Sequence, residues 1–256
     1  MSPAKPTLVL LHGFLGNKLD WQPVIHLLAE QVNCIAVDIE VPNYGAEKDL
    51  SFEERCNRLF HRIERHYQLP ETFSVLGYSM GGRIALCWSN LFADRIASLI
   101  LESCHPGLSE DTERQQRLIH DNDWQKRFQS QPLKTVLQSW YQQPVFRSLT
   151  EPQITQLIQQ KGSTVTPNNL HLLDHFSLGL QSDYSTLQRP SHTHYMYGQR
   201  DTKFLHIAQQ LKSINNDMLL YQFPESGHNV HLDCLKDYSE LISTLLIGTS
   251  KHHDDI

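Results

Sequence analysis

Val75-Leu76-Gly77-Tyr78-Ser79-Met80-Gly81-Gly82-Arg83 is the stretch that decides the fold of this chain. An apolar run over 73–76 enters it and a helical pattern over 83–92 leaves it. Residues 77–81 fit G-x-S-x-G between a strand and a helix, the setting of a nucleophile elbow. The glycines let neighbouring backbone pass closely, so Ser79 is expected on a strained turn above the sheet edge. The alternative is a strand–turn–helix with a chance serine, because short motifs also match by accident.

Length and composition restrict the class of protein. The 256 residues predict one domain with a sizeable core and room for an inserted subdomain. Hydrophobic residues make up 39% and charged residues 20%, as in a soluble globular protein. The net charge of −6 argues against nucleic-acid binding. No apolar stretch approaches the ~20 residues that span a membrane.

The cysteines and histidines predict no metal site. The five cysteines are scattered without a Cys-x-x-Cys pair, which indicates neither a disulfide framework nor a zinc site. The fifteen histidines lack metal-ligand spacing on a shared helix face. The N-terminus runs into a strand without the apolar core of a signal peptide. We therefore expect a cytoplasmic protein.

Apolar runs and helical patterns alternate along the chain. Helices are expected from about Asp20 to Glu30 and from the capping box Ser51-Phe52-Glu53-Glu54 to about Tyr67. Two more are expected, one from the end of the loop 198–204 to about Leu211 and one over 234–246. Strands are expected at 7–11, 34–38, 73–76, 96–101, 194–197 and 218–223. This alternation predicts an α/β fold with a mostly parallel sheet flanked by helices.

Residues 107–189 have a different character, polar and helical with interspersed aromatic side chains. Breaks are expected at Pro132, Pro144, Pro152 and Pro167. We interpret this stretch as an inserted helical cap over the C-terminal edge of the sheet, where ligands bind in open α/β folds. The predicted division is a core of residues 1–106 and 190–248, a cap of 107–189 and a flexible tail of 249–256.

Three residues that each follow a predicted strand are candidates for a catalytic triad. Ser79, Asp201 and His228 stand in the order nucleophile, acid and histidine that α/β-hydrolases use. In such a triad the histidine takes the serine proton and the acid fixes the histidine tautomer. Glu102 also ends a strand and is the alternative acid, but the loop Gly-Gln-Arg-Asp favours Asp201.

The first strand ends in His12-Gly13-Phe14-Leu15-Gly16. A His-Gly after an early strand is a second α/β-hydrolase signature. It places the backbone N–H of Phe14 towards the serine, where it forms an oxyanion hole with the N–H of Met80. The alternative is a glycine-rich turn in which His12 is purely structural.

Basic residues accompany the candidate site. Arg83 begins the elbow helix and Lys203 stands two residues after Asp201, while Arg114, Arg117, Lys126, Arg127 and Lys161 fall in the expected cap. Cations gathered on a negatively charged protein predict an anionic substrate, since arginine binds carboxylates with two parallel hydrogen bonds. For any single cap residue, the alternative is a solvated helix face.

Four stretches resemble one family within the α/β-hydrolase superfamily, the 2-succinyl-6-hydroxy-2,4-cyclohexadiene-1-carboxylate synthases of menaquinone biosynthesis. The resemblance extends from about Leu8 to Leu246. Its most specific part is residues 140–146, the cap motif, because the chemistry of a catalytic triad does not require that stretch. The stretches are residues 77–83, His105-Pro106-Gly107-Leu108, Trp140-Tyr141-Gln142-Gln143-Pro144-Val145-Phe146 and Gly198-Gln199-Arg200-Asp201-Thr202-Lys203-Phe204.

The resemblance implies a lyase that needs no metal or organic cofactor. The implied substrate is 2-succinyl-5-enolpyruvyl-6-hydroxy-3-cyclohexene-1-carboxylate, a small polycarboxylate that loses pyruvate in a 2,5-elimination. Ser79 is then the base, and the substrate contacts are Tyr78, Arg83, Arg117 and Trp140, with Phe146 lining the pocket. Lys161 stands where the family favours arginine. A lysine keeps the positive charge but cannot form the two parallel hydrogen bonds that a guanidinium group makes.

Two other functions stay open at this point. One is a carboxylesterase or C–C bond hydrolase that uses the same triad on an anionic substrate. The other is a non-catalytic ligand-binding protein on this fold, which would not need all three triad residues. The sequence does not decide between a monomer and a homo-oligomer.

Overall fold

The computed structural model describes residues 4–41, 44–186, 193–215 and 217–248. A six-stranded sheet with the order β2-β1-β3-β4-β5-β6 lies at its centre, and every neighbouring pair is parallel. This arrangement confirms the predicted α/β class. The strands are β1 (Thr7–Leu11), β2 (Asn33–Val37), β3 (Phe73–Tyr78), β4 (Ile96–Glu102), β5 (Thr193–Gly198) and β6 (Leu219–Phe223).

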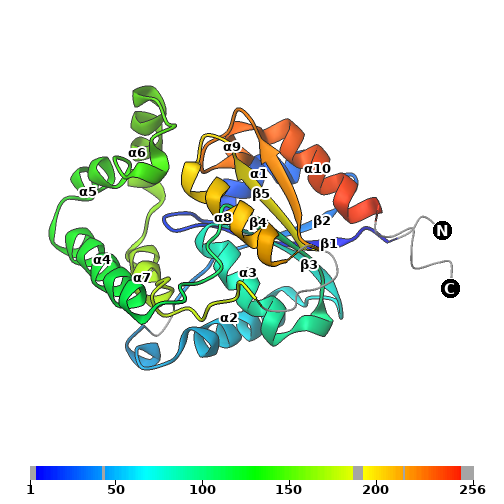
Figure 1. Cartoon of the computed structure of the whole chain (residues 1–256), viewed down its shortest axis with the longest axis horizontal. Coiled ribbons are helices and arrows are strands. Elements are labelled where there is room, and N and C mark those ends of the chain that lie inside the picture. The colour runs from blue at the N-terminus through cyan, green and yellow to red at the C-terminus, as the bar shows by residue number, and fades with distance from the viewer. Residues whose placement is uncertain (1–3, 42–43, 187–192, 216, 249–256) are drawn as a thin grey trace.

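Helices cover both faces of the sheet (Figure 1). One apolar cluster packs α1 (Gln22–Leu28) and α10 (Leu235–Gly248) against one face. The other packs α2 (Phe52–Tyr67), α3 (Met80–Leu91) and α8 (Thr202–Ile214) against the opposite face. Short connecting elements are α9 (Val230–Asp233), η1 (Lys18–Trp21), η2 (Tyr44–Glu47) and η3 (Ala93–Arg95).

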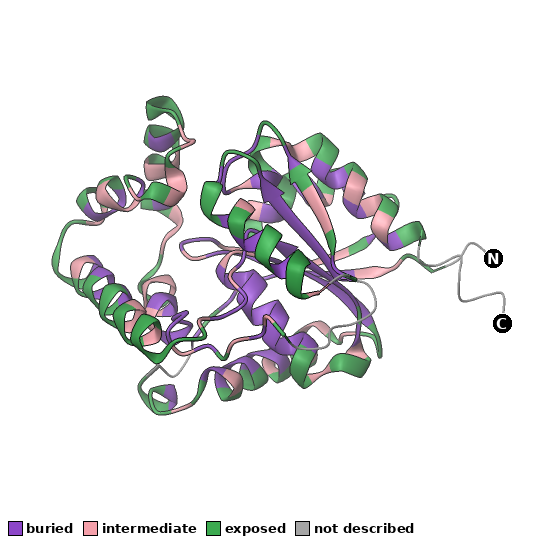
Figure 2. Cartoon of the chain, viewed as in Figure 1, coloured by how far each residue is buried: buried purple, intermediate pink, exposed green. Residues whose placement is uncertain are grey.

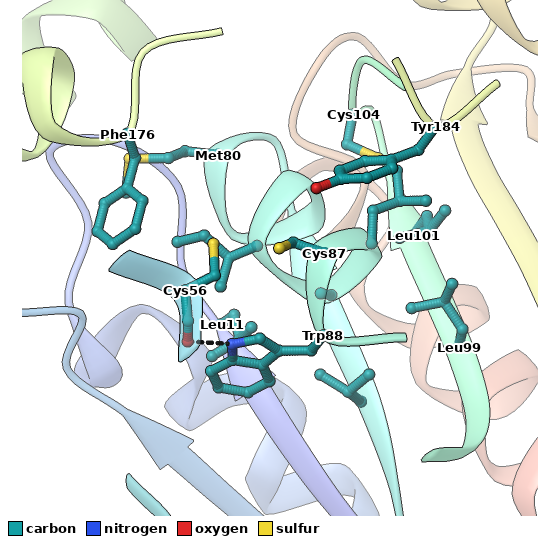
Figure 3. Close-up of a cluster of buried hydrophobic side chains, with 14 of the residues drawn as sticks. Leu11, Cys56, Met80, Cys87, Trp88, Leu99, Leu101, Cys104, Phe176 and Tyr184 are labelled. Atoms are coloured by element: carbon teal, nitrogen blue, oxygen red, sulfur yellow. Dashed lines mark hydrogen bonds between the residues drawn. The ribbon is translucent and has the colours of Figure 1, made fainter. Parts of the chain in front are cut away.

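Helix α3 is the most deeply buried of these helices, as Figure 2 shows by its colour. Its side chains pack between sheet residues such as Leu99 and Leu101 and the side chains of Phe176 and Tyr184 (Figure 3). The indole N–H of Trp88 donates to the carbonyl of Cys56 in α2 at 2.9 Å, so this buried polar group is satisfied. The helix that follows the elbow is therefore held rigidly.

The chain between β4 and β5 forms α4 (Asp111–Ser130), α5 (Leu133–Trp140), η4 (Pro144–Phe146), α6 (Glu151–Thr164) and α7 (Pro167–His175). These helices lie together beside the α/β layers (Figure 1). They share a small apolar core that includes Trp124, Phe128 and Leu137, which Leu15 from the loop after β1 joins. The prolines stand at element starts, because proline is tolerated in the first turn of a helix but not in its interior.

Several element boundaries differ from the predicted ones. Helix α3 begins at Met80, directly after the elbow, although two glycines follow there. The helix expected from Asp20 starts as the 3₁₀ turn η1, capped by Asn17. The capping box at Ser51 is confirmed, with Ser51 Oγ accepting from Glu54 N–H at 3.2 Å. The predicted tail of 249–256 lies outside the described residues.

Candidate active site

Ser79 occupies a strained turn between β3 and α3. Its backbone has φ 50° and ψ −108°, a conformation that costs a non-glycine residue free energy. Its N–H donates to the carbonyl of Glu102 at 2.8 Å, which holds the turn. A Cβ on Gly77 would lie 2.3 Å from the Gly81 carbonyl oxygen, and one on Gly81 would lie 2.2 Å from that of Leu11. Only glycine fits at these two positions.

The structure brings Ser79, Asp201 and His228 together from three separate strand ends. His228 Nδ1 lies 2.7 Å from Asp201 Oδ2, and His228 Nε2 lies 3.3 Å from Ser79 Oγ. Asp201 also caps α8, because its Oδ1 accepts from Phe204 N–H at 3.3 Å. The rings of Phe146 and Phe204 pack against the imidazole, with centroids 5.9 and 4.9 Å away. This chain of contacts is the one that activates a serine.

Glu102, the alternative acid, is fully buried and engaged elsewhere. Its carboxyl group accepts from the backbone N–H of His231 at 3.1 Å and from Tyr238 OH at 2.7 Å, and it lies 2.8 Å from His231 Nδ1. His228 therefore has Asp201 as its acidic partner. Asp201 is the acid that the loop Gly-Gln-Arg-Asp favours in the sequence, whereas the contacts of Glu102 depend on how α9 packs on the sheet.

The loop after β1 lies against the start of α3, as the close approach of Gly81 to the carbonyls of Leu11 and His12 shows. His12 Nε2 accepts from Ile39 N–H at 3.0 Å, so its Nδ1 carries the proton and donates to the Gly13 carbonyl at 2.7 Å. Burial lowers the pKa of His12, in keeping with this neutral tautomer. His12 thus fixes the shape of the loop.

Phe14 follows that turn, and its ring packs on Trp140 with centroids 5.0 Å apart. Met80 is the first residue of α3, where backbone N–H groups have no partner inside the helix. The two backbone segments expected to form an oxyanion hole are therefore neighbours. Phe14 in addition connects the loop to the inserted helices.

A cavity of about 430 Å³ opens beside the serine. Arg117 and Lys203 contribute positive charge to its wall, and Trp140 and Phe146 contribute aromatic surface. His120, Gln143 and Phe204 also line it, and the sequence argument missed them as site residues. Gln143 stands inside the cap motif and Phe204 inside the Asp201 loop, so both motifs contained a usable signal.

Burial, with a smaller contribution from neighbouring cations, lowers the pKa of Lys203 in the cavity wall and of Arg83 and His105, which lie outside its lining. Burial lowers the pKa of Arg83 to about 10, with a further contribution from Arg117. Burial and Arg117 likewise lower the pKa of Lys203. The pKa of His105 falls to about 3, because it is buried and faces Lys203, Arg83 and Arg117. A pocket with this much positive charge favours an anionic ligand.

Arg83 and Arg117 differ in their partners. Arg83 Nη1 donates to the amide oxygen of Gln181 at 3.4 Å, and this glutamine is held by the Pro106 carbonyl at 2.8 Å. Arg117 instead forms an ion pair with Asp121, at 2.8 Å between Nε and Oδ1. The charge of Arg117 is thus partly balanced by a carboxylate, while Arg83 donates to a neutral amide.

A second cavity of about 150 Å³ shares Trp140 and Phe146 with the first, since both residues line both cavities. Tyr78 and Lys161 line this second cavity. Lys161 Nζ is 2.8 and 3.1 Å from the two carboxylate oxygens of Asp20, so the structure places it in an ion pair between α6 and η1. Tyr78 OH donates to Asn229 Oδ1.

The remaining basic residues of α4 face other partners. Half-buried Arg114 pairs with Asp111 and donates to the Leu108 carbonyl at 2.7 Å. Exposed Lys126 pairs with Asp123, and Arg127 stacks 4.1 Å from the Trp124 ring. Among the described residues, no three His, Cys, Asp or Glu side chains could hold a metal ion. Within the same residues, no helix is long and apolar enough to cross a membrane.

The family model described as the alpha/beta hydrolase fold matches residues 6–234. With its parallel sheet and a serine elbow facing a histidine, this chain belongs to the α/β-hydrolase fold family. The solved structure of MenH from S. aureus has the same fold, with a TM-score of 0.81 at 22% identity over 96% of each chain.

Two relatives identify a smaller family within the α/β-hydrolase fold. The Photorhabdus laumondii protein is 33% identical over 98% of this chain and 88% of its own length. The Klebsiella pneumoniae protein is 33% identical over 90% of each chain. Both are named 2-succinyl-6-hydroxy-2,4-cyclohexadiene-1-carboxylate synthase, and this chain belongs to that synthase family.

Proposed function

We propose that the protein is a lyase of menaquinone biosynthesis that eliminates pyruvate from 2-succinyl-5-enolpyruvyl-6-hydroxy-3-cyclohexene-1-carboxylate. The product is 2-succinyl-6-hydroxy-2,4-cyclohexadiene-1-carboxylate. The observation that carries the proposal is the cavity in which Ser79 and His228 stand beside Arg117 and Lys203. A base next to cations suits a substrate with three carboxylates. We place this reaction in the cytoplasm.

The proposed chemistry starts with removal of a proton from the ring carbon beside the succinyl ketone. Ser79 Oγ takes this proton and passes its own to His228, whose tautomer Asp201 fixes. Electrons then move through the ring, and the bond between the ring carbon and the enolpyruvyl oxygen breaks. The leaving group departs as the enolate of pyruvate and takes up one proton to give pyruvate, so that the proton removed from the ring is given up and the triad is restored. Because the serine acts as a base, no acyl-enzyme forms.

Negative charge develops on the ketone oxygen as the proton leaves. We propose that the backbone N–H groups of Phe14 and Met80 stabilise this dienolate oxygen, as an oxyanion hole stabilises a tetrahedral oxyanion. His12 supports this role because its two hydrogen bonds fix the preceding turn. A preorganised donor pair lowers the barrier without reorganising during the reaction.

Substrate binding is assigned to two groups of residues. Arg83, Arg117 and Lys203 supply positive charge near the serine, and Trp140 and Phe146 form the aromatic wall. Tyr78 and Lys161 are assigned to the neighbouring cavity. We propose that residues 107–189 form the cap over a core of residues 1–106 and 190–248, so that substrate is enclosed between them.

Incubation of the purified protein with the pathway intermediate tests the proposal. Diene absorbance and pyruvate, followed together, should rise in equal amounts. A parallel assay with p-nitrophenyl acetate separates the lyase from a carboxylesterase on the same triad, which would release nitrophenol in a burst and then turn over. Rapid ester turnover without pyruvate release would reject the lyase.

A further inference from the structure

One buried acidic side chain beside the site takes no part in the proposed chemistry. Glu102 is the last residue of β4 and has no exposed surface. Its strand lies between β3, which leads to Ser79, and β5, which leads to Asp201. Burying a carboxyl group costs free energy unless hydrogen bonds offset it, so its contacts indicate what it holds.

The main chain of Glu102 holds the nucleophile. Glu102 is the register partner of Tyr78 at the end of the β3–β4 pair. Directly beyond this pair, the Glu102 carbonyl accepts from Ser79 N–H at 2.8 Å. This bond restrains the residue whose φ of 50° would otherwise relax.

The side chain of Glu102 holds the segment that carries the catalytic histidine. It accepts from His231 N–H at 3.1 Å and lies 2.8 and 2.9 Å from His231 Nδ1. The His231 ring is packed between Trp21 and Tyr78, with centroids 4.7 and 4.9 Å away. His231, in α9, follows His228 by three residues, so an anchor on His231 restrains the position of His228.

We propose that Glu102 is a positioning residue that sets the separation between Ser79 Oγ and His228 Nε2, which is 3.3 Å. Its carbonyl fixes the serine and its carboxyl group fixes the histidine segment. One residue thereby ties together two loops that lie far apart in the sequence. The inference rests on the proposed function only in that both use the same serine and histidine.

The competing explanation is that Glu102 only anchors α9 and α10 to the sheet. It receives a hydrogen bond from Tyr238 OH of α10 at 2.7 Å, which serves stability without involving the histidine segment. An anchor of this kind predicts a loss of stability with unchanged reactivity of the folded protein. Tyr238→Phe removes only that bond and is the matched control.

Two conservative variants distinguish the effect of the length of the Glu102 side chain from the effect of its charge. Glu102→Asp keeps the acid but withdraws it by about 1.5 Å, the length of one carbon–carbon bond. Glu102→Gln keeps the reach and still offers an oxygen to His231 N–H. If position matters, the shorter side chain loses reactivity and the amide retains it.

The readout is the rate at which a small fluorophosphonate labels Ser79, followed by intact mass. Serine oxygen bonds to phosphorus, fluoride leaves and His228 takes the serine proton, so the rate reports the serine–histidine pair without the natural substrate. Labelling of Glu102→Asp should fall about tenfold or more, since displacements near 1 Å have such effects. Labelling of Glu102→Gln and Tyr238→Phe should stay within about threefold of wild type. In a His228→Ala background, Glu102→Asp should change the residual rate little.

Lyase turnover of the same variants completes the test, with kcat falling in Glu102→Asp and KM nearly unchanged. Labelling of Glu102→Asp at the wild-type rate overturns the inference. An equal loss with and without His228 also overturns it, because the effect would then not pass through the histidine. Absence of turnover in a wild type whose serine is labelled normally rejects the proposed function and leaves the positioning role standing.

Discussion

His105 makes the stability of the fold depend on pH in a way that can be calculated. Its Nδ1 accepts from Gly107 N–H at 3.2 Å, which requires a neutral ring. Burial and the charges of Lys203, Arg83 and Arg117 lower its pKa from 6.5 to about 3. Because the folded pKa lies below the unfolded one, the unfolded chain binds the proton first. The contribution of neutral His105 to the free energy of unfolding is therefore fully present above pH 6.5 and is lost progressively as the pH falls below 6.5.

The stability that protonation of His105 removes at pH 5 depends only on the pKa of His105 in the unfolded chain, provided that its pKa in the folded protein lies well below 5. The difference of 1.5 pH units between 6.5 and 5 corresponds to about 2 kcal/mol of the free energy of unfolding. In His105→Asn this contribution disappears, since the amide oxygen can accept from Gly107 N–H without titrating.

Urea unfolding of both proteins at pH 8 and pH 5 measures this contribution. The wild type should lose about 2 kcal/mol more than His105→Asn between the two pH values, because other titrating groups cancel in the comparison. Equal losses would show that His105 is protonated in the folded protein and that the cationic surroundings do not act on it as described.

Three further predictions concern other contacts. Gln181→Glu places a carboxylate beside Arg83, so KM for the polycarboxylate should rise about tenfold while kcat changes less. Steady-state kinetics measures both. Lys161→Met leaves Asp20 unpaired and should cost about 1–3 kcal/mol in urea unfolding, with recovery on adding Asp20→Asn. Gly81→Ala puts a Cβ 2.2 Å from a carbonyl oxygen of β1, so the protein should lose its cooperative thermal transition or most of its activity.

The parts of the fold that the sequence predicted are those with local causes. The elbow at Ser79 needs glycine at fixed spacing, and the capping box at Ser51 satisfies helix N–H groups within four residues. The apolar runs similarly predicted all six strands, with ends that differ by a few residues. Local signals of this kind depend little on the rest of the molecule.

The parts that sequence reasoning left open depend on packing between distant segments. The charge of Lys161 was evident, but its partner Asp20 is 141 positions away. The loop Gly-Gln-Arg-Asp favoured Asp201 as the acidic partner of His228, but the contact of Glu102 with His231 depends on packing that the sequence does not show. Side-chain direction in α4 also escaped prediction, because its helical pattern has no strong apolar face.

Ser79 acts as the base in the proposed pyruvate elimination, and a single variant can test this role. The most direct measurement mixes the pathway intermediate with wild type and with Ser79→Ala, and follows diene absorbance and pyruvate release in the same time course. Wild type should form both products in equal amounts, and the rate in Ser79→Ala should be lower by about a thousandfold or more. Diene and pyruvate formation by Ser79→Ala at the wild-type rate would contradict it.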